Sequence, residues 1–192
     1  GGGAVSGAGA LSGVNVRRLG ATSRYELRLP ASPEALASAV RASLRLTELS
    51  PPAIGFPLLA ATYRAALGEP DFAIHLAGET GAFKSELAAL FQQHFGADMN
   101  RLNLPGAWSS TGNALETLAF HAKDALFVID DFAPQGGSID VARYHAAADR
   151  VFRAAGNQAG RSRLDSTAKL REPNPPRALI VSTGAKIPRG HT

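Results

Sequence analysis

The feature that most constrains the fold is the stretch from Phe72 to Phe95, FAIHLAGETGAFKSELAALFQQHF. It opens with an apolar run of strand length, turns at Gly78 and Gly81, and continues with apolar residues at helical spacing. Strands that alternate with helices in this way form parallel sheets covered by helices. We therefore expect an α/β fold, with a mainly parallel sheet and helices on both faces.

The turn in this stretch matches a phosphate-binding pattern at all but one position. In the pattern G-x-x-x-x-G-K-[ST], Gly78 is the first glycine, Lys84 the lysine and Ser85 the hydroxyl residue, whereas Phe83 replaces the second glycine. Lys84 would reach the β- and γ-phosphates of a nucleotide, and Ser85 would ligate Mg²⁺. The predicted nucleotide-binding residues are Gly78, Glu79, Thr80, Gly81, Ala82, Phe83, Lys84 and Ser85.

A second pattern lies about 45 residues further on, where the apolar run ALFVI is followed by Asp130 and Asp131. A continuous apolar run of this length is typical of a strand buried on both faces of a parallel sheet. Asp130 would hold Mg²⁺ through water opposite Ser85, and Asp131 would orient or deprotonate an attacking water. A buried strand that runs into an acidic turn without function is the alternative, and the spacing from Ser85 favours the functional interpretation.

A third buried-strand pattern, RALIVST, ends in Ser182 and Thr183. With GETGAFKS, ALFVIDD and RALIVSTG in this order, residues 55–190 resemble the additional-strand class of P-loop ATPases, and more narrowly the helicase-like, primase-associated ATPase domains of phages, plasmids and integrated elements. The resemblance implies ATP and Mg²⁺ as cofactors, a homo-oligomer such as a hexameric ring, and movement along single-stranded DNA. It also implies that Ser182 or Thr183 senses the γ-phosphate. Arg189 would reach a neighbouring subunit's nucleotide, with a surface arginine as the alternative.

The charge is distributed unevenly along the chain. Residues 1–142 carry ten basic and thirteen acidic residues, a net charge of −3, whereas residues 143–192 carry ten and three, a net charge of +7. Such a basic segment favours contact with nucleic acid, although a solvated basic surface is equally compatible with the composition. The basic side chains that we expect to contact DNA are Arg161, Arg163, Lys169 and Arg171.

The composition indicates the compartment of the protein and excludes some kinds of site. The chain has no cysteine, which excludes disulfides and thiolate metal sites and fits the reducing cytoplasm. It has no apolar run of the roughly 18 residues that a membrane span needs, so we expect no membrane partner. The glycine-rich start has no initiator methionine and indicates a segment of a longer protein.

These patterns divide the chain into three parts. Residues 1–13 form a flexible, low-complexity end, and residues 69–192 form the ATPase core, which we expect to be incomplete at its C-terminal side. Between them, the alternation of Tyr25, Leu27 and Leu29 predicts a hairpin strand, and two helices are expected to pack on the core. The first of these helices begins at Pro33 and carries an apolar face of Leu36, Val40 and Leu44.

Two functions remain open at this point. The preferred one is an ATP-hydrolysing motor that acts on DNA. The alternative is a nucleotide-dependent switch that binds ATP and hydrolyses it slowly or not at all. Trp108 and the isolated His75 are interpreted as structural residues.

Overall fold

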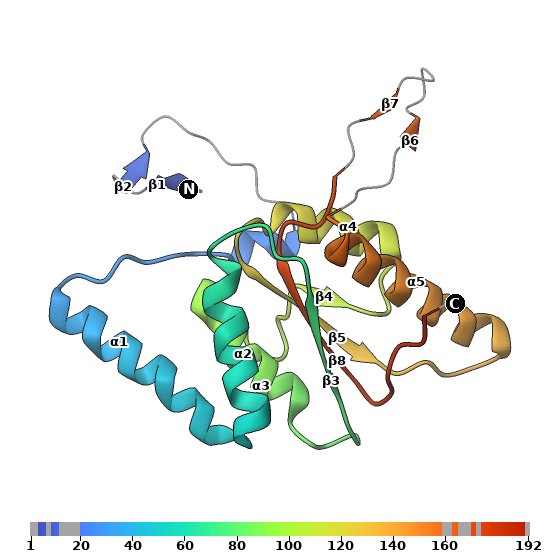
Figure 1. Ribbon diagram of the computed structural model, residues 1–192, viewed down its shortest axis with the longest axis horizontal. Coiled ribbons are helices and arrows are strands. Elements are labelled where there is room, and N and C mark those ends of the chain that lie inside the picture. Colours follow the sequence, from blue (N-terminus) through green and yellow to red (C-terminus); the bar gives the residue numbers. More distant parts are fainter. Residues whose placement is uncertain are drawn as a thin grey trace.

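A computed structural model describes residues 20–158 and 174–190, and also the backbone of four short strands outside these ranges. In the two ranges, four parallel strands form one sheet in the order β3 (Ala73–Ala77), β8 (Leu179–Gly184), β5 (Leu126–Phe132) and β4 (Gly106–Ala107). Figure 1 shows these strands at the centre of the molecule. The prediction of an α/β fold with a parallel sheet is therefore confirmed.

Two helices cover each face of the sheet. On one face lie α2 (Pro52–Ala65) and α3 (Lys84–Gln92), and α3 continues into the 3-10 helix η3 (Gln93–Phe95). On the other face lie α4 (Gly112–His121) and α5 (Ser138–Gly156). The prediction of helices on both faces is confirmed, and the sheet is the middle of three layers.

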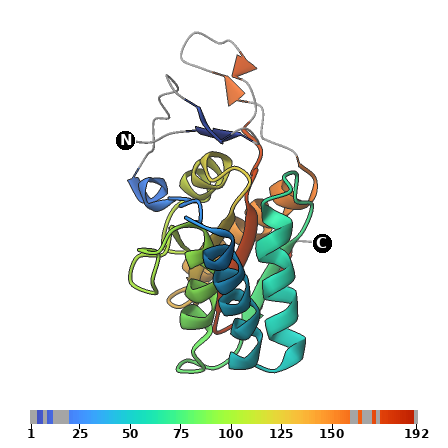
Figure 2. The ribbon, with the colours of Figure 1, turned by 90° about the vertical axis from the view of Figure 1, so that its left-hand side faces the viewer.

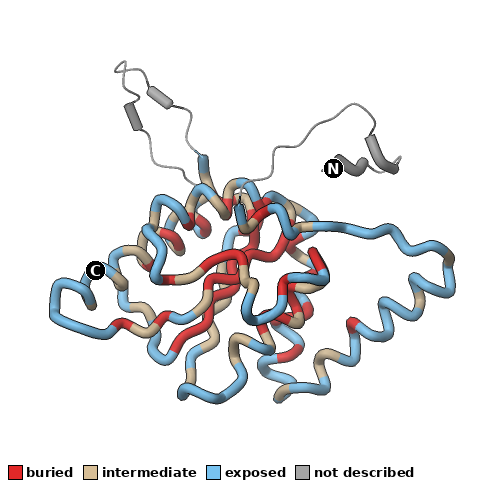
Figure 3. Tube along the Cα trace, turned by 180° about the vertical axis from the view of Figure 1, so that it is seen from behind, coloured by how far each residue is buried: buried red, intermediate tan, exposed pale blue. Residues whose placement is uncertain are grey.

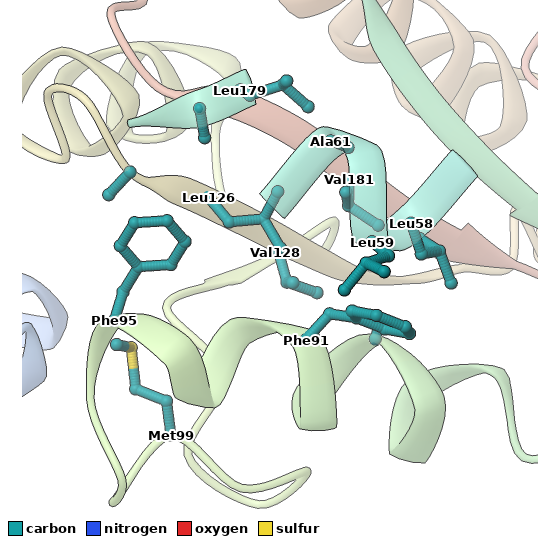
Figure 4. Packing of buried hydrophobic residues seen from close by; sticks show 13 residues of the cluster. Leu58, Leu59, Ala61, Phe91, Phe95, Met99, Leu126, Val128, Leu179 and Val181 are labelled. Carbon is teal, nitrogen blue, oxygen red and sulfur yellow. The ribbon is translucent and has the colours of Figure 1, made fainter. Parts of the chain in front are cut away.

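The two central strands supply both cores, because their side chains alternate between the faces. Leu126 and Val128 of β5 pack with Leu58 and Phe91 beneath α2 and α3 (Figure 4). Phe127 and its neighbours on the opposite face pack beneath α4 and α5. Figure 3 shows burial concentrated along these strands. Burial on both faces explains why the sequence of β5 is continuously apolar.

The Gln92 side chain bonds the part of β5 that the short strand β4 does not reach. Because β4 pairs only with Ile129 and Asp130, the earlier part of β5 has no strand on that side within the described residues. There the Gln92 side chain accepts from the N–H of Val128 (2.8 Å), and its amide donates to the carbonyl of Leu126 (2.9 Å). Buried backbone groups are thereby satisfied by α3 instead of by a neighbouring strand.

The predicted hairpin strand at Tyr25, Leu27 and Leu29 is wrong. The 3-10 helix η1 (Gly20–Arg24) precedes this segment, and residues 25–30 have no regular structure. The Tyr25 hydroxyl donates to the Leu126 carbonyl at 2.7 Å, but Leu27 and Leu29 are exposed. The alternation fails as a strand signal because only Tyr25 finds a partner in the core.

The first predicted helix is present but does not cover the core. Helix α1 (Pro33–Arg45) begins where expected, with the Ser32 hydroxyl accepting from the Ala35 N–H at 3.2 Å. Its apolar residues Leu36, Val40 and Leu44 are 51%, 41% and 52% exposed, which contradicts the expected packing. The 3-10 helix η2 (Leu46–Leu49) contacts α2 and α3, and near the end of α1 the Ser43 hydroxyl accepts from the Tyr63 hydroxyl of α2 at 3.1 Å. Figure 2 shows α1 in front of those helices.

Two short antiparallel pairs complete the described structure. The first joins β1 (Ala4–Ser6) to β2 (Gly9–Leu11), where the composition predicts an irregular end. The second joins β6 (Arg163–Leu164) to β7 (Leu170–Arg171) within the basic segment. In the described part of the chain, no helix has the length and apolar character that crossing a membrane requires.

Candidate nucleotide-binding site

The predicted phosphate-binding loop lies at the carboxyl end of the sheet. It leaves β3 at Ala77 and enters α3 at Lys84, so the strand–turn–helix arrangement expected from the sequence is present. The Gly78 N–H donates to the Gly184 carbonyl at 3.2 Å, which ties the start of the loop to the end of β8. The first N–H groups of α3 have no acceptor within the helix and can bind an anion.

Phe83 occupies the glycine position of the pattern in a conformation that glycine favours. Its φ is 55° and its ψ is 21°, in the left-handed region, and it is 80% exposed. The phenyl ring therefore does not fill the loop. A side chain in this region costs roughly 1–2 kcal/mol, so the loop retains the expected turn at some cost in stability.

Three predicted residues from three different elements meet at one carboxylate oxygen. The hydroxyl of Ser85, in α3, donates to Oδ1 of Asp130, in β5, at 2.6 Å. The hydroxyl of Thr183, in β8, donates to the same oxygen. The structure therefore brings together the two residues predicted to hold Mg²⁺ and one of the two predicted to sense the γ-phosphate.

A bulge in β5 exposes Asp131 beside this cluster. The pairing of β5 with β8 shifts register between Ile129 and Phe132, and Asp131 has a φ of 63°. Its N–H donates to the Thr183 hydroxyl at 3.4 Å, and the residue is exposed. Gly184 permits the close approach of the strands, because a Cβ there would lie 2.6 Å from the Phe132 carbonyl oxygen.

A cleft of about 480 Å³ opens above these groups. Lys84 lines it and donates from Nζ to the Glu79 carbonyl at 2.7 Å. The lining residues that the sequence predicted are Thr80, Gly81, Phe83, Lys84, Ser85, Asp131 and Thr183. Those that it did not predict are Glu86, Arg101, Gly184 and Ala185. Glu86 and Gly184 directly flank predicted motifs, which was a usable signal, whereas Arg101 lies in a connection without any pattern.

Ser182 faces away from the cleft, into the core beneath α5. Its hydroxyl accepts from the Trp108 indole N–H at 2.8 Å and lies 2.9 Å from Nδ1 of His75. Nε2 of His75 is 2.9 Å from the Lys186 carbonyl, which can only accept, so Nε2 carries the proton. Burial is the main cause that lowers the pKa of His75, so neutral His75 accepts from Ser182 through Nδ1.

The structure does not bring the other predicted residues to the cleft. The backbone N–H of Arg189 donates to Nδ1 of His145, in α5, at 3.0 Å, and Arg189 does not line the cleft. Arg161 and Lys169 lie outside the described residues. For Arg163 and Arg171 the structure describes the backbone alone, as a pair in the β6–β7 register.

Comparison with protein-family models, with curated proteins and with solved structures finds no match for this chain.

Proposed function

We propose that this chain binds ATP together with Mg²⁺ in the cleft and hydrolyses it, and that hydrolysis drives movement on DNA. The observation that carries the proposal is the hydrogen bond of 2.6 Å from Ser85 to Asp130. It joins the end of the predicted phosphate loop to the acidic end of β5, across 45 positions of sequence. Two patterns that were identified separately thus form one polar cluster.

Phosphate binding is supported by the groups around the loop. Lys84 supplies a positive charge, and the N-terminus of α3 supplies backbone donors and the positive end of the helix dipole. The cleft of about 480 Å³ between the loop and the ends of β5 and β8 has room for a polyphosphate, and Phe83, which lines it, is an exposed residue.

The residues present also fit Mg²⁺. Within the described residues there is no group of three or more acidic, histidine or cysteine side chains that would hold a metal by themselves. Mg²⁺ commonly takes one or two protein oxygens and completes its shell with water and phosphate oxygens. The Ser85 hydroxyl and the Asp130 carboxylate are such oxygens, and the bound ion would neutralise phosphate charge.

Hydrolysis requires a group that positions water, and we assign this role to Asp131. Its carboxylate is exposed in the cleft and can accept a hydrogen bond from a water. The water oxygen would bond to the γ-phosphorus while the bond to the β–γ bridging oxygen breaks, and the water proton would leave toward Asp131 or a phosphate oxygen. Thr183, which donates to Asp130, would keep that carboxylate oriented.

The DNA part of the proposal is supported by charge and by the resemblance stated above. Residues 143–192 carry a net charge of +7, and cations of this kind bind nucleic acid backbones. As in ring-forming helicase-like ATPases, Arg189 would act on the nucleotide of a second copy of this chain, and the basic residues Arg161, Arg163, Lys169 and Arg171 would contact single-stranded DNA.

The test is ATP hydrolysis by the unaltered chain, with and without single-stranded DNA, beside Lys84→Ala. We expect hydrolysis that DNA increases and that Lys84→Ala lowers by at least about a hundredfold, since a preorganised charge on the phosphates is removed. Lys123→Ala is the matched control, because Lys123 is an exposed lysine paired with Asp124 before the start of β5, away from the cleft.

Equal hydrolysis by Lys84→Ala and Lys123→Ala would contradict the proposed site. Nucleotide binding that depends on Lys84 without DNA-stimulated turnover would contradict the motor and favour the nucleotide-dependent switch. Nucleotide binding is therefore measured on the same samples by isothermal titration calorimetry.

A further inference from the structure

Arg101 is the second basic side chain of the cleft. Among the described residues that line it, Lys84 and Arg101 are basic, and Glu86 and Asp131 are acidic. Lys84 comes from the predicted loop, but Arg101 comes from the connection between η3 and β4. Basic side chains from two separate parts of the chain therefore line the cleft.

The backbone that carries Arg101 is held in place. The Asn103 N–H donates to the Asn100 carbonyl at 2.9 Å, and the Leu102 N–H donates to the Asn100 side chain at 2.9 Å, so residues 100–103 form a tight turn. Met99 before the turn and Pro105 after it are buried. Because the turn is already fixed, binding of a ligand by Arg101 would have to order its side chain but not its backbone.

The present partner of Arg101 is easily exchanged. Its Nε lies 3.2 Å from Oε2 of Glu86, and the two side chains are 59% and 48% exposed. Exposed ion pairs of this kind contribute little to stability. Glu86 belongs to the first turn of α3, two residues after Lys84, so the pair holds the guanidinium beside the phosphate loop. A phosphate group would offer the guanidinium a more highly charged, bidentate acceptor.

We propose that Arg101 binds the terminal phosphate of the nucleoside triphosphate in the same subunit. The inference rests on the proposed function, because it concerns the same cleft. Arg101 lines the cleft together with Asp131, which is proposed above to position the attacking water, and with Thr183, which the resemblance implies as a γ-phosphate sensor. The site would then distinguish a triphosphate from a diphosphate within one chain, whereas Arg189 would act between chains.

The experiment compares binding of AMP-PNP and of ADP, each with Mg²⁺, by isothermal titration calorimetry. We expect Arg101→Ala to weaken AMP-PNP binding at least about tenfold, the loss expected when a charge-assisted contact is removed, and to weaken ADP binding less than about twofold. Arg101→Lys keeps the charge without the planar fork and should weaken AMP-PNP binding about threefold.

Arg28→Ala is the matched control. Arg28 is an exposed arginine whose Nε lies 3.3 Å from Glu26, and the Glu26 N–H donates to the carbonyl of Phe95, the last residue of η3, eleven residues after Lys84. AMP-PNP binding by Arg101→Ala as tight as by Arg28→Ala, or equal losses for the two nucleotides, would overturn the assignment while leaving the proposed function intact. No nucleotide binding by the unaltered chain, or binding unaffected by Lys84→Ala, would overturn both.

Discussion

Phe83 has a backbone conformation that is unfavourable for its large side chain. Large aromatic residues rarely adopt positive φ, yet Phe83 does so while it is 80% exposed and therefore gains little packing energy. The conformation persists because the chain must reverse between β3 and the first turn of α3 at this point. The loop is thus maintained by its two anchoring elements and not by the preference of its own residue.

Replacing Phe83 tests that explanation. Phe83→Gly and Phe83→Ala both remove the ring, but only glycine removes the Cβ that makes positive φ unfavourable. We expect Phe83→Gly to have a free energy of unfolding about 1 kcal/mol above that of Phe83→Ala, after allowance for the greater freedom of glycine in the unfolded chain. Urea denaturation of the two variants measures the difference. Equal stability, or greater stability of the alanine variant, would show that the loop does not impose positive φ on this position.

At the scale of the element, β8 assigns different roles to two neighbouring hydroxyls. Successive residues of a strand face opposite sides, so Ser182 meets Trp108 and His75 in the core whereas Thr183 meets Asp130 at the cleft. The sequence presented both as alternatives for one function. The position of Thr183 beside Asp130 favours it over Ser182 as the residue that faces the nucleotide. Ser182 instead supplies the acceptor that the buried indole N–H of Trp108 needs.

Two substitutions separate these roles. Ser182→Ala should lower the free energy of unfolding by roughly 1–3 kcal/mol, because the Trp108 N–H loses its acceptor, and should leave ATP hydrolysis per folded molecule nearly unchanged. Thr183→Val keeps the shape of the side chain but should lower hydrolysis about tenfold by freeing the Asp130 carboxylate. Urea denaturation and steady-state hydrolysis provide the two measurements. A larger loss of activity in Ser182→Ala than in Thr183→Val would contradict the assignment.

The parts of the fold that sequence patterns predicted are those decided by local chemistry. Continuous apolar runs predict the buried strands β5 and β8, and the glycines and Lys84 predict the loop. The failures concern partners that lie far away in sequence. An amphipathic α1 predicts a buried face without showing whether any surface covers it, and Arg101 reaches the cleft through a connection that has no periodic pattern.

At the scale of the whole molecule, two partly buried histidines join segments that are distant in sequence. His75 links β3 to Ser182 of β8 and to the Lys186 carbonyl. His94 accepts from the Ser43 hydroxyl of α1 at 2.7 Å through Nε2, since its Nδ1 is directed at the Phe91 carbonyl at 2.9 Å. Burial is the main cause that lowers the pKa of both histidines, so both contacts depend on neutral imidazoles.

The free energy of unfolding should therefore decrease as the pH falls. The pKa of each histidine is lower in the folded chain than in the unfolded chain, so the unfolded state binds protons more readily. The free energy of unfolding should be highest above the ordinary histidine pKa of about 6.5 and should fall as the pH drops through and below that value. Urea denaturation between about pH 8 and pH 5 measures the slope.

A pair of variants identifies the source of that slope. His75→Gln removes one of the two titrations and should flatten the dependence on pH. His121→Gln removes an exposed histidine at the end of α4 and should retain the slope. A slope unchanged by His75→Gln and reduced by His121→Gln would contradict the explanation.

The position of β8 also has a consequence for how the protein is made. β8 is the last of the four sheet strands to be synthesised, yet it lies between β3 and β5, and Ile74 pairs with Val181. Until the ribosome has released that strand, β3 and β5 lack the neighbour through which they join, and the apolar residues of β5 stay incompletely covered. Sheets closed by such distant partners form slowly. Nascent chains of this protein are therefore expected to need protection from aggregation until nearly the whole sheet has emerged.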